Sequence, residues 1–472
     1  MHARDAVKTP RQIIGDLSGL VGLPACLAET ITLTGAEPAL PSSFRVGAAA
    51  QAVIGAVTAA VSEIHARRTG YLFAPSVDMR HAALEFRSGN YLRVNGQAPP
   101  DPWDAIAGIY RCGDGRFVRL HTNFPHHRDG VLRLLGCANN RQSVGDALKT
   151  WEAEKFETVA TEAGMVVAAL RSFPEWDAHP QAASVASLPA VSLERIGDAP
   201  PTPLPTNGDR PLSGIRALDL TRVIAGPVSG RVLAAHGADV LRITGAHLPS
   251  LGHAEIDVGR GKLQAGLDLR TDSDRETLRG LIRDADIFTQ GYRPGALAGR
   301  GFSPEAVAAV KPGIIYVSLS AYGHYGPWAG KRGFDSLVQT ATGINQAEAD
   351  AFGTPDKPMP LPCQALDHAS GYLLALGALA GLLRRADEGG SWLVRVSLAG
   401  TGHWLRGLGR LQNGFNAPDP GFADVADLIE ETDSGFGRIA ALRHAGQIAG
   451  ASPHWARPAM PLGSAAPVWP VR

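Results

Sequence analysis

The sequence is poor in cysteine and carries no net charge. Its four cysteines form no CxxC pair and have no histidine at metal-ligand spacing: Cys26, Cys112, Cys137 and Cys363. This pattern argues against a disulfide framework and a structural zinc site, and it suits a reducing compartment. Lys plus Arg and Asp plus Glu both number 45, so the signature of a general nucleic-acid binder is missing. We expect small molecules or protein surfaces as partners, and no metal.

Long hydrophobic runs are also missing. The two most apolar stretches, residues 46–61 and 371–383, contain glycine and are shorter than the roughly 20 residues of a bilayer crossing. We expect them to be buried core helices, without membrane contact. The N-terminus has early charges and no sustained apolar core before a cleavage site, so no signal peptide is indicated and a cytoplasmic location is expected.

Proline and glycine mark one boundary. In residues 195–212, Pro200, Pro201, Pro203 and Pro205 precede Asn207-Gly208. These residues disfavour a regular helix or a central strand, and they predict an exposed linker. With 472 residues the chain is long enough for at least two domains.

The two sides of this linker differ in pattern. After it, strand-like and helix-like stretches alternate, with strands at 215–220, 238–243, 286–290 and 313–318 and helices at 228–236, 273–283 and 304–310. Such alternation predicts the α/β class, a parallel sheet with helices on its faces. Before it we expect a long helix at 46–67, short strands at 108–110 and 116–121 around a hairpin turn, and helices near 129–135 and 151–162.

Residues 220–230 combine a strand end, glycines and a helix start. A helix N-terminus offers amide donors to a phosphate or carboxylate. The loop lacks the GxGxxG pattern, and the next strand ends at Thr244 instead of an acidic residue, which argues against NAD. Taken alone, the loop is better explained as an ordinary βα turn.

Basic side chains recur at the predicted strand ends and loops. They are Arg222, Arg260, Lys262, Arg270, Arg293, Arg300 and Arg332. A ligand with several phosphates, such as coenzyme A, needs scattered cations of this kind. We expect about half of them to be solvated surface charges instead.

Asp367 opens an Ala/Leu/Gly-rich helix that runs to about residue 383. Aspartate is a preferred N-cap, and from the residues alone this structural role is favoured. The functional alternative uses the same geometry, since amide donors and the helix dipole would keep the carboxylate ionised and nucleophilic. The pair His126-His127 is expected in a solvated loop, because adjacent residues do not face one site. No GxSxG motif supports an α/β-hydrolase.

The two apolar stretches resemble each other in sequence, which suggests an internal repeat. Aligning Gly55 with Gly377 places Arg45 opposite Asp367. If the repeat is real, only the later copy has the carboxylate. The alternative is that the two helices are unrelated and look alike only because both are rich in alanine and glycine.

Three longer stretches carry a family resemblance. They are residues 211–243 (PLSGIRALDLTRVIAGPVSGRVLAAHGADVLRI), 266–302 (GLDLRTDSDRETLRGLIRDADIFTQGYRPGALAGRGF) and 314–343 (IIYVSLSAYGHYGPWAGKRGFDSLVQTATG). Together they resemble the family III CoA-transferases of the formyl-CoA transferase type, over about residues 211–400. The resemblance implies a Rossmann-like parallel-sheet large domain with a smaller α/β domain, in a homodimer of interlocked chains. It also implies acyl-CoA and a small carboxylic acid as substrates, without metal or NAD.

The resemblance assigns residues as well. Asp367 matches the nucleophile, which accepts the acyl group and then CoA as an aspartyl-CoA thioester. CoA contacts are implied for Arg222, Val223, Ala225, Leu267, Arg270, Tyr292, Arg300 and Arg332. Some positions depart from the family pattern: Thr244 and Gly245 replace an acidic and a basic residue, Gly291 replaces an asparagine, and Arg300 is displaced from the usual arginine position.

Two other functions stay open. Acyl-CoA racemases of the same family use a histidine where Phe334 stands, and a phenyl ring cannot exchange a proton. A racemase or isomerase is therefore the second choice, and a catalytically inactive CoA-binding subunit is the third.

The N-terminal half resembles the family's later portion. We therefore predict residues 1–205 as a truncated copy without the catalytic aspartate, which includes the small domain at about 105–195, and residues 206–472 as the CoA-binding and catalytic half. On this division an intrachain pseudo-dimer is the alternative to the homodimer.

Overall fold

A seven-stranded, mostly parallel sheet forms the centre of the protein. This computed structural model describes residues 7–101 and 103–471. The strand order is β10-β9-β8-β11-β12-β13-β7, and only β7 runs antiparallel, against β13. Their bounds are β7 Val191–Gly197, β8 Arg216–Leu220, β9 Asp239–Thr244, β10 Lys262–Gly266, β11 Ile287–Gln290, β12 Ile315–Ser320 and β13 Ser391–Ser397. The predicted α/β class with a Rossmann-like parallel sheet is confirmed.

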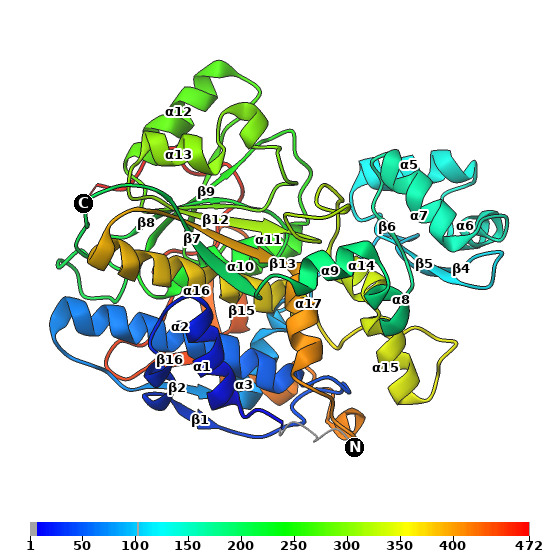
Figure 1. Cartoon of the computed structure of the whole chain (residues 1–472), viewed down its shortest axis with the longest axis horizontal. Coiled ribbons are helices and arrows are strands. Elements are labelled where there is room, and N and C mark those ends of the chain that lie inside the picture. Colours follow the sequence, from blue (N-terminus) through cyan, green and yellow to red (C-terminus); the bar gives the residue numbers. More distant parts are fainter. Residues whose placement is uncertain (1–6, 102, 472) are drawn as a thin grey trace.

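Successive strand residues feed two separate cores, because side chains alternate between the faces of a sheet. Leu218 and Phe288 pack with helices α12 (Asp272–Arg283) and α13 (Pro304–Val310). Ala217 and Ile287 belong to the larger core, which contains α10 (Ala225–Ala235) and α16 (Ala365–Glu388). Figure 1 shows α12 and α13 above the sheet and α10 and α16 below it.

Helix α2 (Val46–Thr69) packs against α16 on the side away from the sheet (Figure 1). Each helix has 24 residues, and by length and composition each would pass as a membrane span, yet almost all of both is buried. The expected core helices are thus found, and both are longer than the apolar runs that predicted them.

The elements around α2 come from both ends of the chain. A three-stranded sheet has the order β1-β2-β16, so a strand near the C-terminus completes it. The bounds are α1 Pro10–Leu20, η1 Ala25–Glu29, β1 Thr32–Thr34, β2 Pro75–Asp78, α3 Met79–Glu85, α4 Ser88–Tyr91 and β16 Gly446–Ile448.

A smaller unit extends from the main body (Figure 1, cyan). Its sheet, β4-β5-β6, has its own core with three helices, and β4 and β5 form the predicted hairpin. The bounds are β4 Gly108–Arg111, β5 Phe117–Leu120, α5 Pro125–Leu135, α6 Arg141–Leu148, α7 Ala153–Glu162 and β6 Val167–Ala169. We call these elements the small unit. Helices α8 (Phe173–Asp177) and α9 (Pro180–Ala186) lead from it back to β7.

The remaining elements follow the main sheet or cover its edges. They are α11 Gly252–Val258, η2 Ala298–Arg300, α14 Asp335–Ala341, α15 Ile344–Phe352, α17 Leu398–Gly407, η3 Gly414–Asn416, η4 Ala423–Leu428, β14 Ile429–Ser434, β15 Gly437–Leu442 and β3 Arg93–Val94. The order β14-β15-β3 again joins the C-terminal segment to the first half.

The prediction of a linker at residues 195–212 is wrong at its beginning. Residues 195–197 belong to β7, an edge strand that pairs with β13. β7 needs backbone partners on only one side, and the prolines come after its last residue, so they do not interrupt its pairing with β13. β7 lies before residue 205 yet completes the main sheet, and the division of the chain at that residue stays a prediction.

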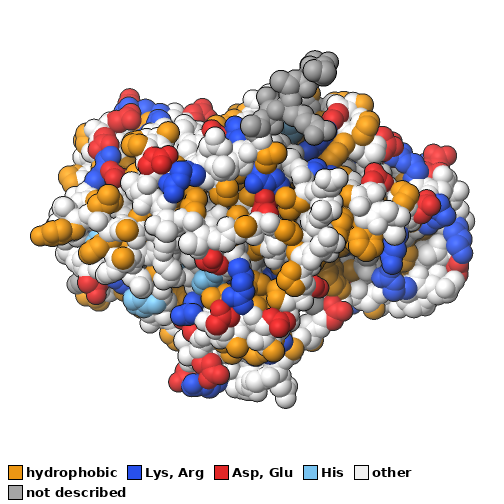
Figure 2. Space-filling view, turned by 90° about the horizontal axis from the view of Figure 1, so that it is seen from below, with side chains coloured by type: hydrophobic (Ala, Val, Ile, Leu, Met, Phe, Trp, Pro, Cys, Tyr) orange, Lys and Arg blue, Asp and Glu red, His pale blue; other side chains and the backbone are white. Residues whose placement is uncertain are grey.

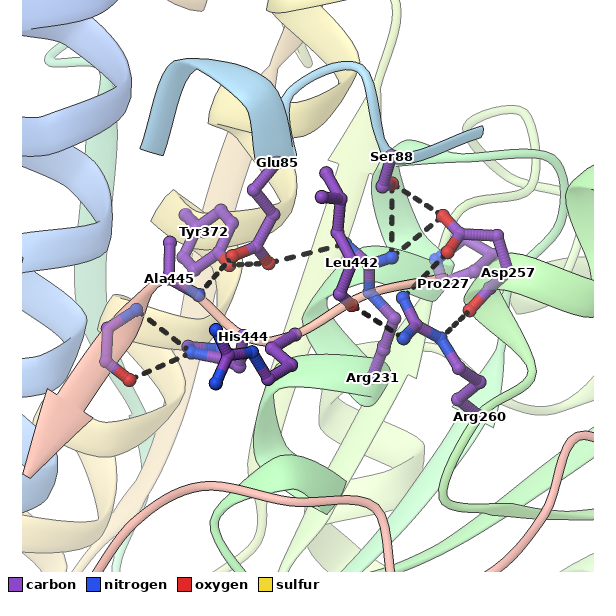
Figure 3. A network of polar contacts seen from close by, with 12 residues as sticks. Glu85, Ser88, Pro227, Arg231, Asp257, Arg260, Tyr372, Leu442, His444 and Ala445 are labelled. Atoms are coloured by element: carbon purple, nitrogen blue, oxygen red, sulfur yellow. Dashed lines mark hydrogen bonds and ion pairs between the residues drawn. The ribbon is translucent and has the colours of Figure 1, made fainter. Parts of the chain in front are cut away.

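A buried charged network ties the first half to the second (Figure 3). Arg231 on α10 forms an ion pair with Asp257 at 2.7 Å, and Ser88 donates to the same carboxylate at 2.6 Å. Glu85 accepts from the Ala445 N–H at 2.6 Å and from the Tyr372 hydroxyl. Burial opposes ionisation of Glu85, but nearby His444 and Arg231 outweigh it and lower its pKa to about 2. Breaking such a buried network by removing one member is costly.

Surface charge on one face agrees with the balanced composition. In Figure 2, Lys and Arg side chains are interspersed with Asp and Glu. This face therefore has no extended patch of one sign, which is the feature that would attract a polyanion.

Candidate active site

A cavity of about 460 Å³ opens at the carboxyl ends of the parallel strands. Leu220, Thr244, Leu267, Tyr292 and Ser320 line it, each at or just beyond the end of a different strand. Ligands of open α/β sheets bind at this edge. The small unit supplies the opposite wall through Phe124, His126, His127 and Val166.

All nine residues predicted for the site lie on this one cavity. They are Arg222, Val223, Ala225, Leu267, Arg270, Tyr292, Arg300, Arg332 and Asp367. The sequence separates the first and last of them by 145 positions, so the parallel sheet is what brings them together. Their individual roles stay predictions.

Asp367 is not the N-cap of α16. Gln364 holds that place, and Asp367 is the third residue of the helix. The Gln364 side chain makes no capping bond, and the Asp367 carboxyl does not fill the capping role that the sequence favoured for it. Its residue is 7% exposed, and this exposure is toward the cavity that it lines.

A second buried carboxylate, Asp335, caps the helix instead. Its Oδ2 accepts the N–H of Asp367 at 2.9 Å, and it also accepts the Leu366 N–H and the Gln339 side-chain amide. These donors favour the ionised form of Asp335, yet burial outweighs them and raises its pKa to about 6.

Burial, and then the charge of Asp335, raise the pKa of the Asp367 carboxyl well above its usual value. Both effects oppose ionisation of Asp367, contrary to the expectation that the helix terminus keeps this carboxyl ionised. The amides at the helix start donate to Asp335, so they do not stabilise a negative charge on the Asp367 carboxyl. The two carboxyls form a pair in which Asp367 more readily keeps the proton.

The loop after β8 presents backbone donors to the cavity. Ile224 precedes α10 without a side-chain cap, so the first amides of the helix have no side-chain acceptor. Val223 has a positive φ of 72°, a conformation that a β-branched residue rarely adopts. Backbone held in this way at a cavity is suited to an anionic ligand.

Five of the seven predicted cations line the cavity: Arg222, Arg270, Arg293, Arg300 and Arg332. The Arg222 guanidinium lies 5.3 Å from the Phe124 ring centroid, and Arg270 pairs with Asp268 at 2.6 Å. Arg260 and Lys262 are neither at the cavity nor solvated. Arg260 joins the network of Figure 3, and Lys262 forms a buried ion pair with Asp219 at 2.7 Å.

The prediction of a solvated loop for His126 and His127 is wrong about the loop, and it is wrong about solvation for His127, which is buried, whereas His126 is exposed. Both lie in the first turn of α5 and both line the cavity. Burial lowers the pKa of His127 to about 3, so its imidazole is neutral. Sequence spacing gave no sign of this, because the small unit reaches the cavity only through the tertiary fold.

Phe334 also lines the cavity, and His121 packs against it. Their rings stack with centroids 4.0 Å apart, and Phe334 immediately precedes α14 and Asp335. The position at which a racemase would hold a proton-transferring histidine is thus occupied by a stacked, non-ionisable ring.

Fold and site together define a Rossmann-like α/β protein with a buried carboxyl pair at a basic ligand cavity. Residues 212–421 match the model of CoA-transferase family III. The resemblance to this family is confirmed over these residues.

Similar proteins include an acetyl-coenzyme A transferase of Hypoxylon pulicicidum, 36% identical over 64% of this chain and 54% of the relative. A formyl-CoA:oxalate CoA-transferase of Escherichia coli is 31% identical over 40% of this chain and 47% of the relative. The chain thus spans about half the length of these relatives. A crystal structure of a hypothetical protein from Mycobacterium tuberculosis is 32% identical, with a TM-score of 0.39 over 42% of this chain and 58% of that one.

Proposed function

We propose that this protein transfers CoA from an acyl-CoA to a free carboxylic acid through Asp367. The observation that supports this most strongly is the position of Asp367, a buried carboxyl on the same cavity as five arginines. The names of the family and of the relatives point to CoA thioester chemistry as well.

The reaction begins once Asp367 is a carboxylate, so its proton must pass to Asp335 or to solvent. A carboxylate oxygen attacks the thioester carbonyl carbon, the C–S bond breaks, and a mixed anhydride and CoA thiolate form. The thiolate attacks the Asp367 carbonyl carbon, which releases the first acid as its carboxylate and leaves an aspartyl-CoA thioester.

The second acid reverses these steps. Its carboxylate attacks the Asp367 carbonyl and expels the thiolate, which then attacks the new acyl carbonyl. The products are the new acyl-CoA and the free Asp367 carboxylate. Every step exchanges one activated acyl bond for another, so no external energy source is required.

The arginines that line the cavity suit the phosphates of CoA. Arg222, Arg270 and Arg300 lie there with the uncapped start of α10. Guanidinium groups and helix N-termini are the usual partners of phosphate. CoA contacts from Val223, Ala225, Leu267, Tyr292 and Arg332 are part of the same proposal.

We also propose that the N-terminal half takes the place of a partner chain. Helix α2 packs along α16, and the small unit provides one wall of the cavity. Light scattering of the purified protein tests this: a mass near 49.6 kDa supports the intrachain pseudo-dimer, whereas twice that mass supports the homodimer.

The central experiment traps the acyl-enzyme. Incubation with an acyl-CoA and hydroxylamine, followed by mass spectrometry, should yield a hydroxamate on the peptide that contains Asp367. The matched control is Asp350→Asn, which removes an exposed carboxyl on α15 and should leave transfer unchanged. Normal turnover in a folded Asp367→Asn variant would exclude the mechanism, and exchange of the acyl α-proton without transfer would favour the racemase.

A further inference from the structure

The histidine pair at the start of α5 has no role in the proposed transfer steps, yet both residues line the cavity. His126 is exposed and His127 is buried. The Nδ1 atom of His127 is buried and has no hydrogen-bond partner in the part of the chain that the structure describes. Arg128, on the same turn, pairs with Asp129 at 2.9 Å. Buried polar atoms are normally hydrogen-bonded, so the histidine side of this turn is suited to receive a ligand.

Two arginines of the main body reach the small unit beside these histidines. The Arg222 guanidinium lies 5.3 Å from the ring centroid of Phe124, and the His126 ring stacks on the same phenyl ring with centroids 6.0 Å apart. Arg332 donates to the Gly164 carbonyl at 2.8 Å. The charges of both arginines reach the His126 ring. We call the group formed by Phe124, His126, Arg222 and Arg332 the basic joint.

Neither arginine of the basic joint has a carboxylate partner among the described residues. Their hydrogen bonds go to backbone carbonyl groups. The charge of Glu255 reaches Arg222, but Glu255 forms its ion pair with Arg242. Burial lowers the pKa of both guanidinium groups of the joint. Because a partly buried cation without a counter-charge is unfavourable, an anion bound here is stabilised more than one bound to exposed arginines.

The described acids on the cavity wall do not supply this anion. They are Asp268 and Asp367. Asp268 is held by Arg270 at 2.6 Å. Burial, and then the charge of Asp335, favour the protonated form of Asp367. The counter-charge must therefore come from a ligand, and the groups of an acyl-CoA with the strongest negative charge are its phosphates.

We propose that a phosphate group of the acyl-CoA binds at the basic joint, between Arg222 and Arg332 of the main body and the imidazolium of His126 on the small unit. The bound phosphate thereby connects the two parts of the molecule. This rests on the proposed function, to which it adds a phosphate-binding residue and a dependence of binding on pH.

Binding at the basic joint should take up a proton. Burial, and then the charges of Arg332 and Arg222, lower the pKa of His126 from its usual 6.5 in the free protein. A bound phosphate raises this pKa again, so affinity falls as the pH rises through the interval between the two values. His127 takes no part in the proton uptake, because burial lowers its pKa to about 3.

Calorimetric titration of the full chain with CoA tests the proposal without any acyl transfer. His126→Gln should weaken the binding of CoA about tenfold at pH 6 and change it little at pH 8. His126→Lys keeps a cation at both pH values, so it should bind CoA tightly at pH 6 and at pH 8. The matched control is His403→Gln, which removes an exposed histidine on α17 and should bind like the wild type. Because a phosphate monoester itself titrates near pH 6, the variants are compared with the wild type at the same pH.

Dephospho-CoA, which keeps the diphosphate and lacks the 3′-phosphate, identifies the bound group. A loss of affinity in His126→Gln for both ligands assigns the diphosphate, and a loss confined to CoA assigns the 3′-phosphate. Equal affinity of the wild type and His126→Gln for both ligands at pH 6 would overturn the inference and leave the transferase intact. Absence of transfer and of any adduct on Asp367 would instead overturn the proposed function, and the binding constants of the histidine variants would still decide the inference.

Discussion

Helices α2 and α16 are alike in length and in packing, but they differ at their N-terminal ends, where we expect the chemistry to occur at α16. Both have 24 residues and lie side by side in the main core. In both, the N–H of the third residue is accepted by a carboxylate from outside the helix: Ala48 donates to Glu37 at 3.0 Å, and Asp367 donates to Asp335 at 2.9 Å. The third residue is alanine in one and aspartate in the other.

The charge balance at the two helix starts differs as well. Glu37 is neutralised by Arg45 at 2.6 Å, and both side chains are less than 10% exposed. No ion pair to Asp335 occurs among the described residues, and a second carboxyl is set beside it instead. At the start of α2 the carboxylate thus has an ion-pair partner, whereas at the start of α16 two carboxyls lie together at a cavity without one among the described residues. Local charge conflict of this kind is typical of functional sites.

The structure also corrects the alignment of the two helices. Pairing Gly55 with Gly377 placed Arg45 opposite Asp367, but Arg45 precedes the first residue of α2 and therefore corresponds to Gln364. Ala48 is the counterpart of Asp367 by position in the helix. The conclusion that only the later copy has the carboxylate is unchanged.

The largest expected effect is a loss of transfer activity when the third residue of α16 is replaced. Asp367→Ala, which gives α16 the third residue of α2, should reduce transfer at least about 10³-fold because the nucleophile is removed. The melting temperature at pH 8 should stay equal or rise, since a carboxyl whose pKa is raised by burial destabilises the fold once it ionises. Both quantities are measured on one preparation, by a transfer assay and by thermal unfolding. Wild-type transfer activity in this variant would show that the start of α16 is no more catalytic than the start of α2.

The next effect belongs to α2 and concerns stability. Arg45→Met leaves Glu37 buried without its partner and should lower the free energy of unfolding by about 3–5 kcal/mol. The kcat of the folded protein should not change. In the double variant Arg45→Met, Glu37→Gln the loss should be smaller, since no buried charge is left unpaired. Chemical denaturation provides the measurement, and an equal loss in the single and double variants would show that the charge pair is not the cause.

A smaller effect contrasts Gly55 and Gly377, the glycines that the sequence comparison had paired. A Cβ at Gly377 would lie 2.4 Å from Cγ1 of Val394, a stiff side chain on β13, which is paired with a strand on each side. A Cβ at Gly55 would meet only the far ends of two isoleucine side chains, Ile14 at 2.7 Å and Ile31 at 3.3 Å. Gly377→Ala should therefore cost about 1–3 kcal/mol.

Gly55→Ala should be close to neutral, because the flexible Ile14 end can move and alanine favours a helix by roughly 1 kcal/mol. The two free energies of unfolding, measured by the same denaturant titration, give the contrast directly. A larger cost at Gly55 than at Gly377 would contradict it.

The sequence predicted the repeating part of the fold well. Alternating strands and helices after residue 212 lie within a few residues of their expected places, because one hydrophobic period decides each of them. Edge strand β7 was missed, since its pairing with β13 is a contact between segments nearly 200 residues apart, next to prolines that suggested a linker.

The candidate site was predicted in part for the same reason. Residues at the ends of parallel strands must converge, so Arg222 and Tyr292 could be placed near one another in advance. The contribution of His127 and the coupling of Asp335 to Asp367 could not. Both depend on which loop lies against which helix start, and neither leaves a periodic signal in the sequence.

The smallest effect tests the acidic pair at the start of α16. The charge of Asp335 contributes to the raised pKa of Asp367, so Asp335→Asn should lower that pKa. The acid limb of the kcat/KM profile should then move to lower pH, with a gain of up to about tenfold near pH 5 and little change at pH 8. The asparagine oxygen can still accept the Asp367 N–H, which keeps the helix start intact.

The same substitution should also change how the stability of the protein depends on pH. The Asp335 pKa is raised from 3.8 to about 6 on folding, so its contribution to stability is fully present below pH 3.8 and is lost as pH rises through 6. Asp335→Asn should therefore be neutral or stabilising at pH 8 relative to the wild type, and least favourable near pH 3. The Glu37→Gln variant of α2 is the control, because Glu37 lies at the other helix start and away from the cavity, and it should leave the kcat/KM profile in place. If Asp335→Asn moved the acid limb to higher pH, Asp335 would be acting as the proton acceptor for Asp367 and not as the charge that opposes its ionisation.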